Sequence, residues 1–146
     1  MTARGTDDLL ASARARIWRV EPHELEGVHA DGGLVVDIRP EAQRAEEGDL
    51  GFGVVVERNV LEWRFDLLGD HALAEVAGYD QPVVVVCSEG YASSLAAASL
   101  RELGFTQAGD LIGGYLAWRR WRDGAAGPAV DGVVTTGGPP PNPAEE

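Results

Sequence analysis

The segment from Pro82 to Cys87 constrains the fold of this 146-residue chain more than any other part of the sequence. It contains four consecutive valines and ends at Cys87, the only cysteine in the chain. An unbroken run of β-branched side chains is typical of a strand buried on both faces, as the strands of parallel sheets are. Because parallel strands need long crossover connections, usually helices, the segment predicts an α/β fold with a mainly parallel sheet.

The remainder of the chain alternates between predicted strands and predicted helices, which agrees with this fold. A second apolar run, Leu34 to Ile38, lies between Gly33 and Pro40 and predicts another buried strand. Shorter strands are predicted at residues 17–20, 54–56 and 107–111. Helices are predicted at residues 7–16, 22–29, 70–77 and 93–103, and from residue 114 onward.

The charge balance of the chain argues against two classes of partner. The chain has 12 basic and 24 acidic residues, a formal net charge of −12, and every basic residue is an arginine. A surface that binds nucleic acid needs basic side chains to displace counterions from phosphates, and docking to anionic lipid needs them as well. We therefore expect no nucleic-acid partner and no membrane partner.

The cysteine count and the lack of long apolar segments narrow the protein class further. One thiol cannot form an internal disulfide or a cysteine-rich zinc site. Residues 1–20 contain no apolar run of signal-peptide length, and no segment has the roughly 18 apolar residues of a membrane-spanning helix. We expect a cytoplasmic protein without a metal or organic cofactor. A single domain is predicted at residues 1–122, with a flexible Gly/Pro-rich tail at residues 123–146.

Cys87 lies where a parallel sheet places ligand sites, at the carboxyl end of a buried strand and before a helix. The connecting loop is short and contains Gly90, so its backbone N–H groups can turn inward and favour a negative charge at their centre. A thiolate held in this way is nucleophilic. The alternative interpretation is that Cys87 is a small buried apolar residue, and the local pattern alone leaves both interpretations open.

Four separate stretches, taken together, resemble one known protein family. In chain order they are LVVDIRP at 34–40, GDLGFG at 48–53, CSEGYAS at 87–93, and LGF at 103–105 continuing through GGY at 113–115 to Trp118. This arrangement, which spans residues 34–121, resembles the rhodanese-like sulfurtransferases of the single-domain type. The resemblance implies a three-layer α/β/α sandwich around a five-stranded parallel sheet.

The resemblance also implies a reaction and a set of site residues. Cys87 is expected to take a sulfane sulfur from a small-molecule donor, such as thiosulfate or a persulfide, and to become a persulfide itself. A nucleophilic acceptor, such as a thiol or cyanide, would then remove that sulfur; no protein partner is indicated. Asp37 and Arg39 are expected to form a structural ion pair beneath the loop. The backbone amides expected to bind the substrate are those of Ser88, Glu89, Gly90, Tyr91, Ala92 and Ser93.

Some residues depart from what the family usually has at these positions. Asp49 stands where the family often has a histidine, and the active loop contains Glu89 and no cation. A carboxylate that faced the pocket would oppose the binding of thiosulfate, which is a dianion. Arg64 is the candidate for positive charge at the pocket, with a surface arginine over Trp63 as the equally weighted alternative.

Two other functions are alternatives to sulfur transfer. One is a non-catalytic rhodanese-like binding or sensing module, but such members usually lack the loop cysteine. The other is phosphatase chemistry on the same fold, which needs an arginine at the sixth position after the cysteine to hold phosphate with two hydrogen bonds. In this chain that position is occupied by Ser93, so the sequence favours the sulfurtransferase.

Overall fold

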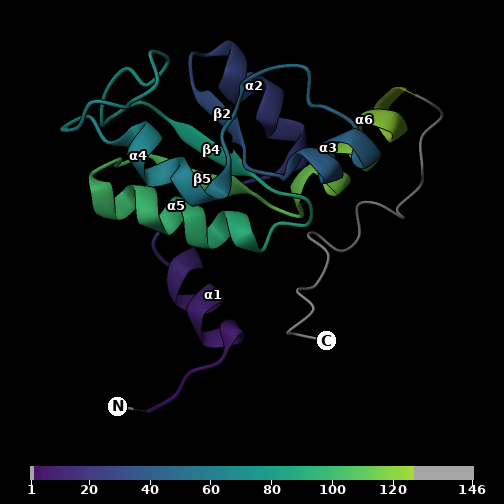
Figure 1. Ribbon diagram of the computed structural model, residues 1–146. Helices are drawn as coiled ribbons and strands as arrows, with labels where there is room; N and C mark the ends of the chain where they lie inside the picture. The colour runs from purple at the N-terminus through teal and green to yellow at the C-terminus, as the bar shows by residue number, and fades with distance from the viewer. Residues whose placement is uncertain (1, 127–146) are drawn as a thin grey trace.

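The computed structural model describes residues 2–126 and has five parallel strands at its centre (Figure 1). The strand order is β1-β5-β4-β2-β3, and every neighbouring pair is parallel. This arrangement confirms the five-stranded α/β sheet expected from the sequence. The strands are β1 (Trp18–Val20), β2 (Leu34–Asp37), β3 (Val54–Val55), β4 (Val83–Val86) and β5 (Ala108–Leu111).

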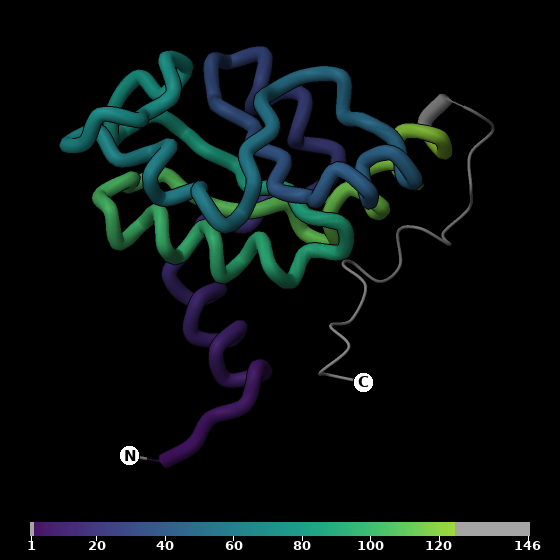
Figure 2. Tube along the Cα trace, viewed as in Figure 1, coloured from purple at the N-terminus to yellow at the C-terminus, as the bar shows by residue number. Residues whose placement is uncertain are grey.

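Helices cover both faces of the sheet and complete three layers (Figure 2). On one face, α4 and α5 contribute Phe65 and Leu100 to one core, while α2 and α6 contribute Leu25 and Trp118 to the core on the other face. The helices are α1 (Thr6–Arg14), α2 (Leu25–Ala30), α3 (Glu41–Glu47), α4 (Leu61–Phe65), α5 (Ala92–Leu103) and α6 (Gly114–Ala126), with short 3-10 turns η1 (Pro22–Glu24) and η2 (Arg58–Val60).

The valine run of β4 divides its side chains between the two cores. Val83 and Val85 pack in the core under α4 and α5, whereas Val84 and Val86 pack in the core under α2 and α6. Successive side chains of a strand point to opposite faces, and all four valines are fully buried. Cys87 follows directly after this central strand, at the carboxyl ends of the strands.

Helix α1 lies outside the two helical layers and packs against α5. Leu10 and Ala13 form its buried side, while its N-terminal end leads away from the body of the protein (Figures 1 and 2). Ala13 and the neighbouring Arg14 bring the last turn of α1 close to the start of α5.

The prediction of a helix at residues 70–77 is wrong, because this segment forms bends and turns without a helix. Its backbone groups bond outside a helical ladder: the Leu73 N–H donates to the Arg64 carbonyl, and the Ala77 N–H donates to the Gln81 side chain. The Gln81 amide in turn donates to the Glu75 carbonyl. These non-local partners replace the bonds a helix would make.

The end of α6 differs from the predicted domain boundary. The helix runs to Ala126, past the boundary expected at residue 122. The remainder of the predicted flexible tail, residues 127–146, lies outside the described residues. Among residues 2–126, no helix has the length and apolar character needed to cross a membrane.

The close approach of β1 to β5 depends on Gly109. A Cβ atom at this position would lie 2.7 Å from the carbonyl carbon of Trp18 on the neighbouring strand. We expect Gly109→Ala to lower the free energy of unfolding by about 1–3 kcal/mol, measured by urea denaturation. Gly27→Ala is the control, because Gly27 lies in α2 with open space around it, and this change should raise stability by about 0.5–1 kcal/mol. Unchanged stability in Gly109→Ala would contradict the packing described for β1.

Candidate active site

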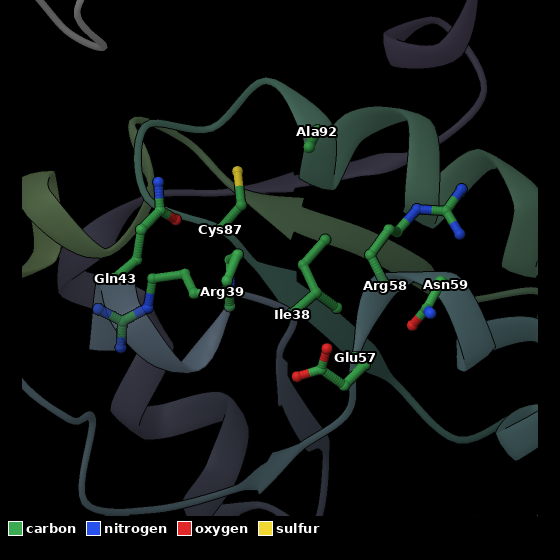
Figure 3. A pocket seen from close by; sticks show the side chains of 9 residues that line it. Ile38, Arg39, Gln43, Glu57, Arg58, Asn59, Cys87 and Ala92 are labelled. Carbon is green, nitrogen blue, oxygen red and sulfur yellow. The ribbon is translucent and has the colours of Figure 1, made fainter. Parts of the chain in front are cut away.

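Cys87 follows the last residue of β4 and lines a cavity of about 360 Å³ (Figure 3). Gln43 of α3 and Arg58 of η2 flank the cysteine on opposite sides in this view. Ile38, which continues from β2, and Ala92, which begins α5, supply apolar surface next to it. The cavity therefore lies at the carboxyl edge of the sheet, where adjacent parallel strands end together.

The loop after Cys87 turns its backbone donors toward the sulfur atom. The Gly90 N–H lies 3.1 Å from Cys87 Sγ, and the Ser93 N–H lies 3.4 Å from it. The thiol itself donates to Ser93 Oγ at 3.2 Å. Gly90 and Ser93 are among the six residues whose amides were expected to surround the site, and each of these two donors would stabilise a negative charge on the sulfur.

The other loop residues divide between the cavity and the exterior. Ala92 lines the cavity, whereas Glu89 is exposed and does not line it. The Ser88 hydroxyl donates to Glu47 Oε2 at 2.7 Å, and Tyr91 is half-buried beside the guanidinium of Arg14. The position of Glu89 removes its carboxylate as a direct obstacle to an anionic substrate.

The first turn of α6 fixes the beginning of the loop. The Tyr115 N–H donates to the Cys87 carbonyl at 2.8 Å, and the Leu116 N–H donates to the Ser88 carbonyl at 3.1 Å. Gly90 has φ +92°, and a Cβ atom there would lie 2.8 Å from the Gly113 nitrogen. Only glycine meets both requirements without strain, so Gly90 allows the loop to pack directly against the start of α6.

Asp110 at the end of β5 is part of the site, although sequence reasoning missed it. Its carboxylate is fully buried and accepts hydrogen bonds from the Ser93 and Ser94 hydroxyls, both at 2.8 Å. Arg19 of β1 donates to the same carboxylate at 2.9 Å. An acidic residue inside the strand predicted at residues 107–111 was the signal that could have identified it, since a carboxylate that becomes buried requires partners.

Asp37 and Arg39 form an ion pair beneath the loop, with Arg39 Nη2 at 2.7 Å from Asp37 Oδ2. Both residues are buried. Arg39 also donates to Glu47 at 3.1 Å and to the Gly48 carbonyl at 2.8 Å. Its guanidinium lies 4.0 Å from the centre of the Tyr115 ring. The pair thus ties β2 to the end of α3 and to α6.

The positive charge of Arg39 is compensated by the carboxylates of Asp37 and Glu47. Burial on its own lowers the pKa of Arg39, but the hydrogen bonds and negative charges of Asp37 and Glu47 outweigh burial and raise the pKa above its ordinary value. Arg39 therefore stays a cation whose charge is matched by two carboxylates, and it offers the cavity little positive potential.

The structure does not place Arg64 at the cavity. Its guanidinium donates instead to the His71 carbonyl at 2.7 Å, which anchors the turn after α4. The arginines that do line the cavity are Arg39 and Arg58, and Arg58 also bonds both carboxylate oxygens of Glu62 at 3.1 Å. Glu57, which precedes Arg58 in the chain, also lines the cavity, so its lining contains a carboxylate as well as cations.

The arrangement is suited to nucleophilic group transfer by a thiol. It combines a cysteine sulfur, backbone donors for an anion, and a cavity next to both. Within residues 2–126, no three or more His, Cys, Asp or Glu side chains are grouped so that they could hold a metal ion.

Comparison with known sequences connects this site to one family. The sequence model of the Rhodanese-like domain family matches residues 21–120. The thiosulfate sulfurtransferase GlpE of Pseudomonas fluorescens strain SBW25 is 31% identical over 101 residues, which cover 69% of this chain and 84% of that protein. The adenylyltransferase and sulfurtransferase MOCS3 of Oryza sativa subsp. japonica is 33% identical over 91 residues, which cover 60% of this chain but only 20% of that protein.

Solved structures show the same fold. A Rhodopseudomonas palustris protein of unknown function, described as a possible tyrosine phosphatase, has a TM-score of 0.75 and 26% identity, covering 89% of this chain and 97% of that one. The human single-domain sulfurtransferase TSTD1 has a TM-score of 0.56 and 21% identity, covering 72% of this chain and 95% of that one. The second likeness concerns the fold alone.

The buried ion pair leads to a stability prediction. Replacing Arg39 by alanine leaves Asp37 without its buried counter-charge, and we expect a loss of about 3–5 kcal/mol in the free energy of unfolding. Arg120→Ala is the matched control, because Arg120 is exposed on α6, and it should change stability by less than about 0.5 kcal/mol. Urea denaturation at neutral pH measures both variants, and equal stabilities would contradict the structural role of the pair.

Proposed function

The chain belongs to the rhodanese-like domain family, and on this premise we propose that it is a sulfurtransferase in which Cys87 carries the transferred sulfur. The observation that carries the proposal is the pair of backbone N–H groups, of Gly90 and Ser93, within hydrogen-bond distance of Cys87 Sγ. A buried apolar cysteine would not need such donors. A sulfur that becomes an anion and then a persulfide does need them.

The proposed reaction has two displacement steps at sulfur. In the first, the Cys87 thiolate attacks the sulfane sulfur of the donor, forming a new S–S bond. The bond between that sulfur and the remainder of the donor breaks, and the electron pair leaves as sulfite from thiosulfate or as a thiolate from a persulfide. In the second, a thiol or cyanide acceptor attacks the outer sulfur, the S–S bond breaks, and the Cys87 thiolate returns.

The loop amides would act on the charged states of both steps. The thiolate and the outer sulfur of the persulfide are anions, and oriented N–H donors stabilise anions without having to reorganise during the reaction. Ser93 is especially well placed, because its N–H points at Sγ while its hydroxyl is held by Asp110. These two hydrogen bonds together fix the position of Ser93 next to the sulfur.

The cavity admits donors larger than an inorganic anion. Its volume of about 360 Å³ is within the range of sites that bind small organic molecules. Its lining mixes apolar surface from Ile38 and Pro40 with the polar groups of Gln43 and Asn59. These features are compatible with an organic persulfide as well as thiosulfate, and both arginines that line the cavity, Arg39 and Arg58, are paired with carboxylates.

Phosphatase chemistry fits the loop less well. A phosphate dianion needs an arginine fork, and the corresponding position is held by Ser93, whose hydroxyl donates to Asp110. The non-catalytic module is also disfavoured, because Cys87 lines a cavity and receives two amide hydrogen bonds.

The direct test is the intact mass of the protein after exposure to sulfur donors. Thiosulfate, mercaptopyruvate and a low-molecular-weight persulfide should be supplied separately. We expect at least one of them to add the mass of one sulfur atom to the wild type and none to modify Cys87→Ser, since serine cannot form the persulfide. Cyanide should then remove the added sulfur as thiocyanate. A wild-type protein that no donor modifies would overturn the proposal.

The charges at the cavity predict how donors are distinguished. Arg58→Ala removes a cation that lines the cavity, so the rate of Cys87 loading by thiosulfate, a dianion, should fall about two- to fivefold, with a smaller effect on an organic persulfide, which carries a single negative charge. Glu57→Gln removes the neighbouring carboxylate and should change thiosulfate loading in the opposite direction. Equal effects of both variants on both donors would contradict the assignment of these residues to the donor site.

A further inference from the structure

The active loop is held by an arginine that lies outside the family-matched residues 21–120. Arg14, the last residue of α1, donates from Nη2 to the Gly90 carbonyl at 2.9 Å and from Nε to Ser94 Oγ at 3.0 Å. Gly90 lies within the loop that surrounds Cys87, and Ser94 directly follows this loop. The packing of Leu10 and Ala13 on α5 brings α1 to this position.

The bond to the Gly90 carbonyl sets the orientation of one loop peptide. A trans peptide points its carbonyl and its N–H in opposite directions. Because the Gly90 oxygen is held toward α1, the N–H of the same peptide, which belongs to Tyr91, points away from α1. If this peptide flipped, the carbonyl oxygen would no longer be held at α1, and a lone pair could face the sulfur. Such a lone pair would repel a thiolate or a persulfide anion.

The bond to Ser94 connects Arg14 to the carboxylate behind the loop. Ser94 Oγ accepts from Arg14 and donates to Asp110 Oδ2 at 2.8 Å. Asp110 also accepts from the Ser93 hydroxyl, and the Ser93 N–H donates to Cys87 Sγ. On the far side, Arg19 binds Asp110 at 2.9 Å, and it too precedes the family-matched segment. Residues of α1 and β1 thus hold the second half of the loop, as α6 holds the first half.

We propose that Arg14 is a positioning residue for sulfur transfer, because its guanidinium fork holds Gly90 and Ser94 so that the loop amides stay aimed at Cys87. Its role in transfer rests on the proposed function, whereas its effect on the nucleophilicity of Cys87 does not. The loop contains no Arg or Lys of its own. Arg14, on the neighbouring helix α1, supplies a planar group that donates two hydrogen bonds to this part of the chain.

The test compares three variants by the rate at which iodoacetamide alkylates Cys87 across a range of pH. Arg14→Gln removes the charge and the fork. Arg14→Lys keeps the charge but cannot bond both acceptors in the same geometry. Arg16→Ala is the control, because Arg16 also joins α1 to α5, through an exposed ion pair with Glu102 at 3.3 Å, and lies away from the loop. Thermal unfolding of each variant is followed in parallel by circular dichroism.

We expect alkylation near neutral pH to be about five- to tenfold slower in Arg14→Gln, with its pH dependence displaced to higher pH. Arg14→Lys should be intermediate, and Arg16→Ala should match the wild type. The inference fails if Arg14→Gln, folded at the assay temperature, keeps the wild-type rate and pH profile, or if Arg16→Ala slows alkylation equally. Should Arg14→Gln be unfolded, Arg14→Lys decides by the same criteria. A slowed Arg14 variant in a protein that no sulfur donor modifies would overturn the proposed function and leave the positioning role standing.

Discussion

The hydrogen bonds from the Gly90 and Ser93 N–H groups to Cys87 Sγ depend on a closed loop, and the remaining structure keeps that loop closed. The chain must turn within a few residues of leaving an apolar central strand. N–H groups in the first turn of α6 donate to the carbonyls of Cys87 and Ser88. The peptides that follow in the loop can then turn toward the sulfur. An anion at the end of a buried strand would be costly without these donors.

The site is built from oriented dipoles more than from cations. Arg39 is matched by Asp37 and Glu47, and Arg58 shares its charge with Glu62, so neither acts as an uncompensated positive group at the cavity. In a chain of net charge −12 this is a consistent design, since amide donors attract an anion without a basic surface. It also explains why the orientation of individual peptides, such as the one held by Arg14, matters for the chemistry.

Sequence reasoning found the parts of the fold that local pattern determines. The valine run of β4 and the alanine-rich α5 have strong intrinsic signals, and the loop cysteine lies between them. The helix expected at 70–77 failed because its backbone is bound by Arg64 and Gln81. Arg14, Arg19 and Asp110 were missed, and Arg64 was chosen instead of Arg58, for one reason: each position is fixed by contacts between segments far apart in sequence or by an irregular loop without periodicity.

A crystal structure of the donor-treated protein tests the central claim most directly. The account predicts one additional sulfur atom bonded to Cys87 Sγ, lying in the cavity and within hydrogen-bond distance of loop N–H groups, with the loop in the conformation described here. An unmodified thiol after treatment with every donor class, or an added sulfur directed away from the loop amides, would contradict the claim that this loop is a cradle for a sulfur anion.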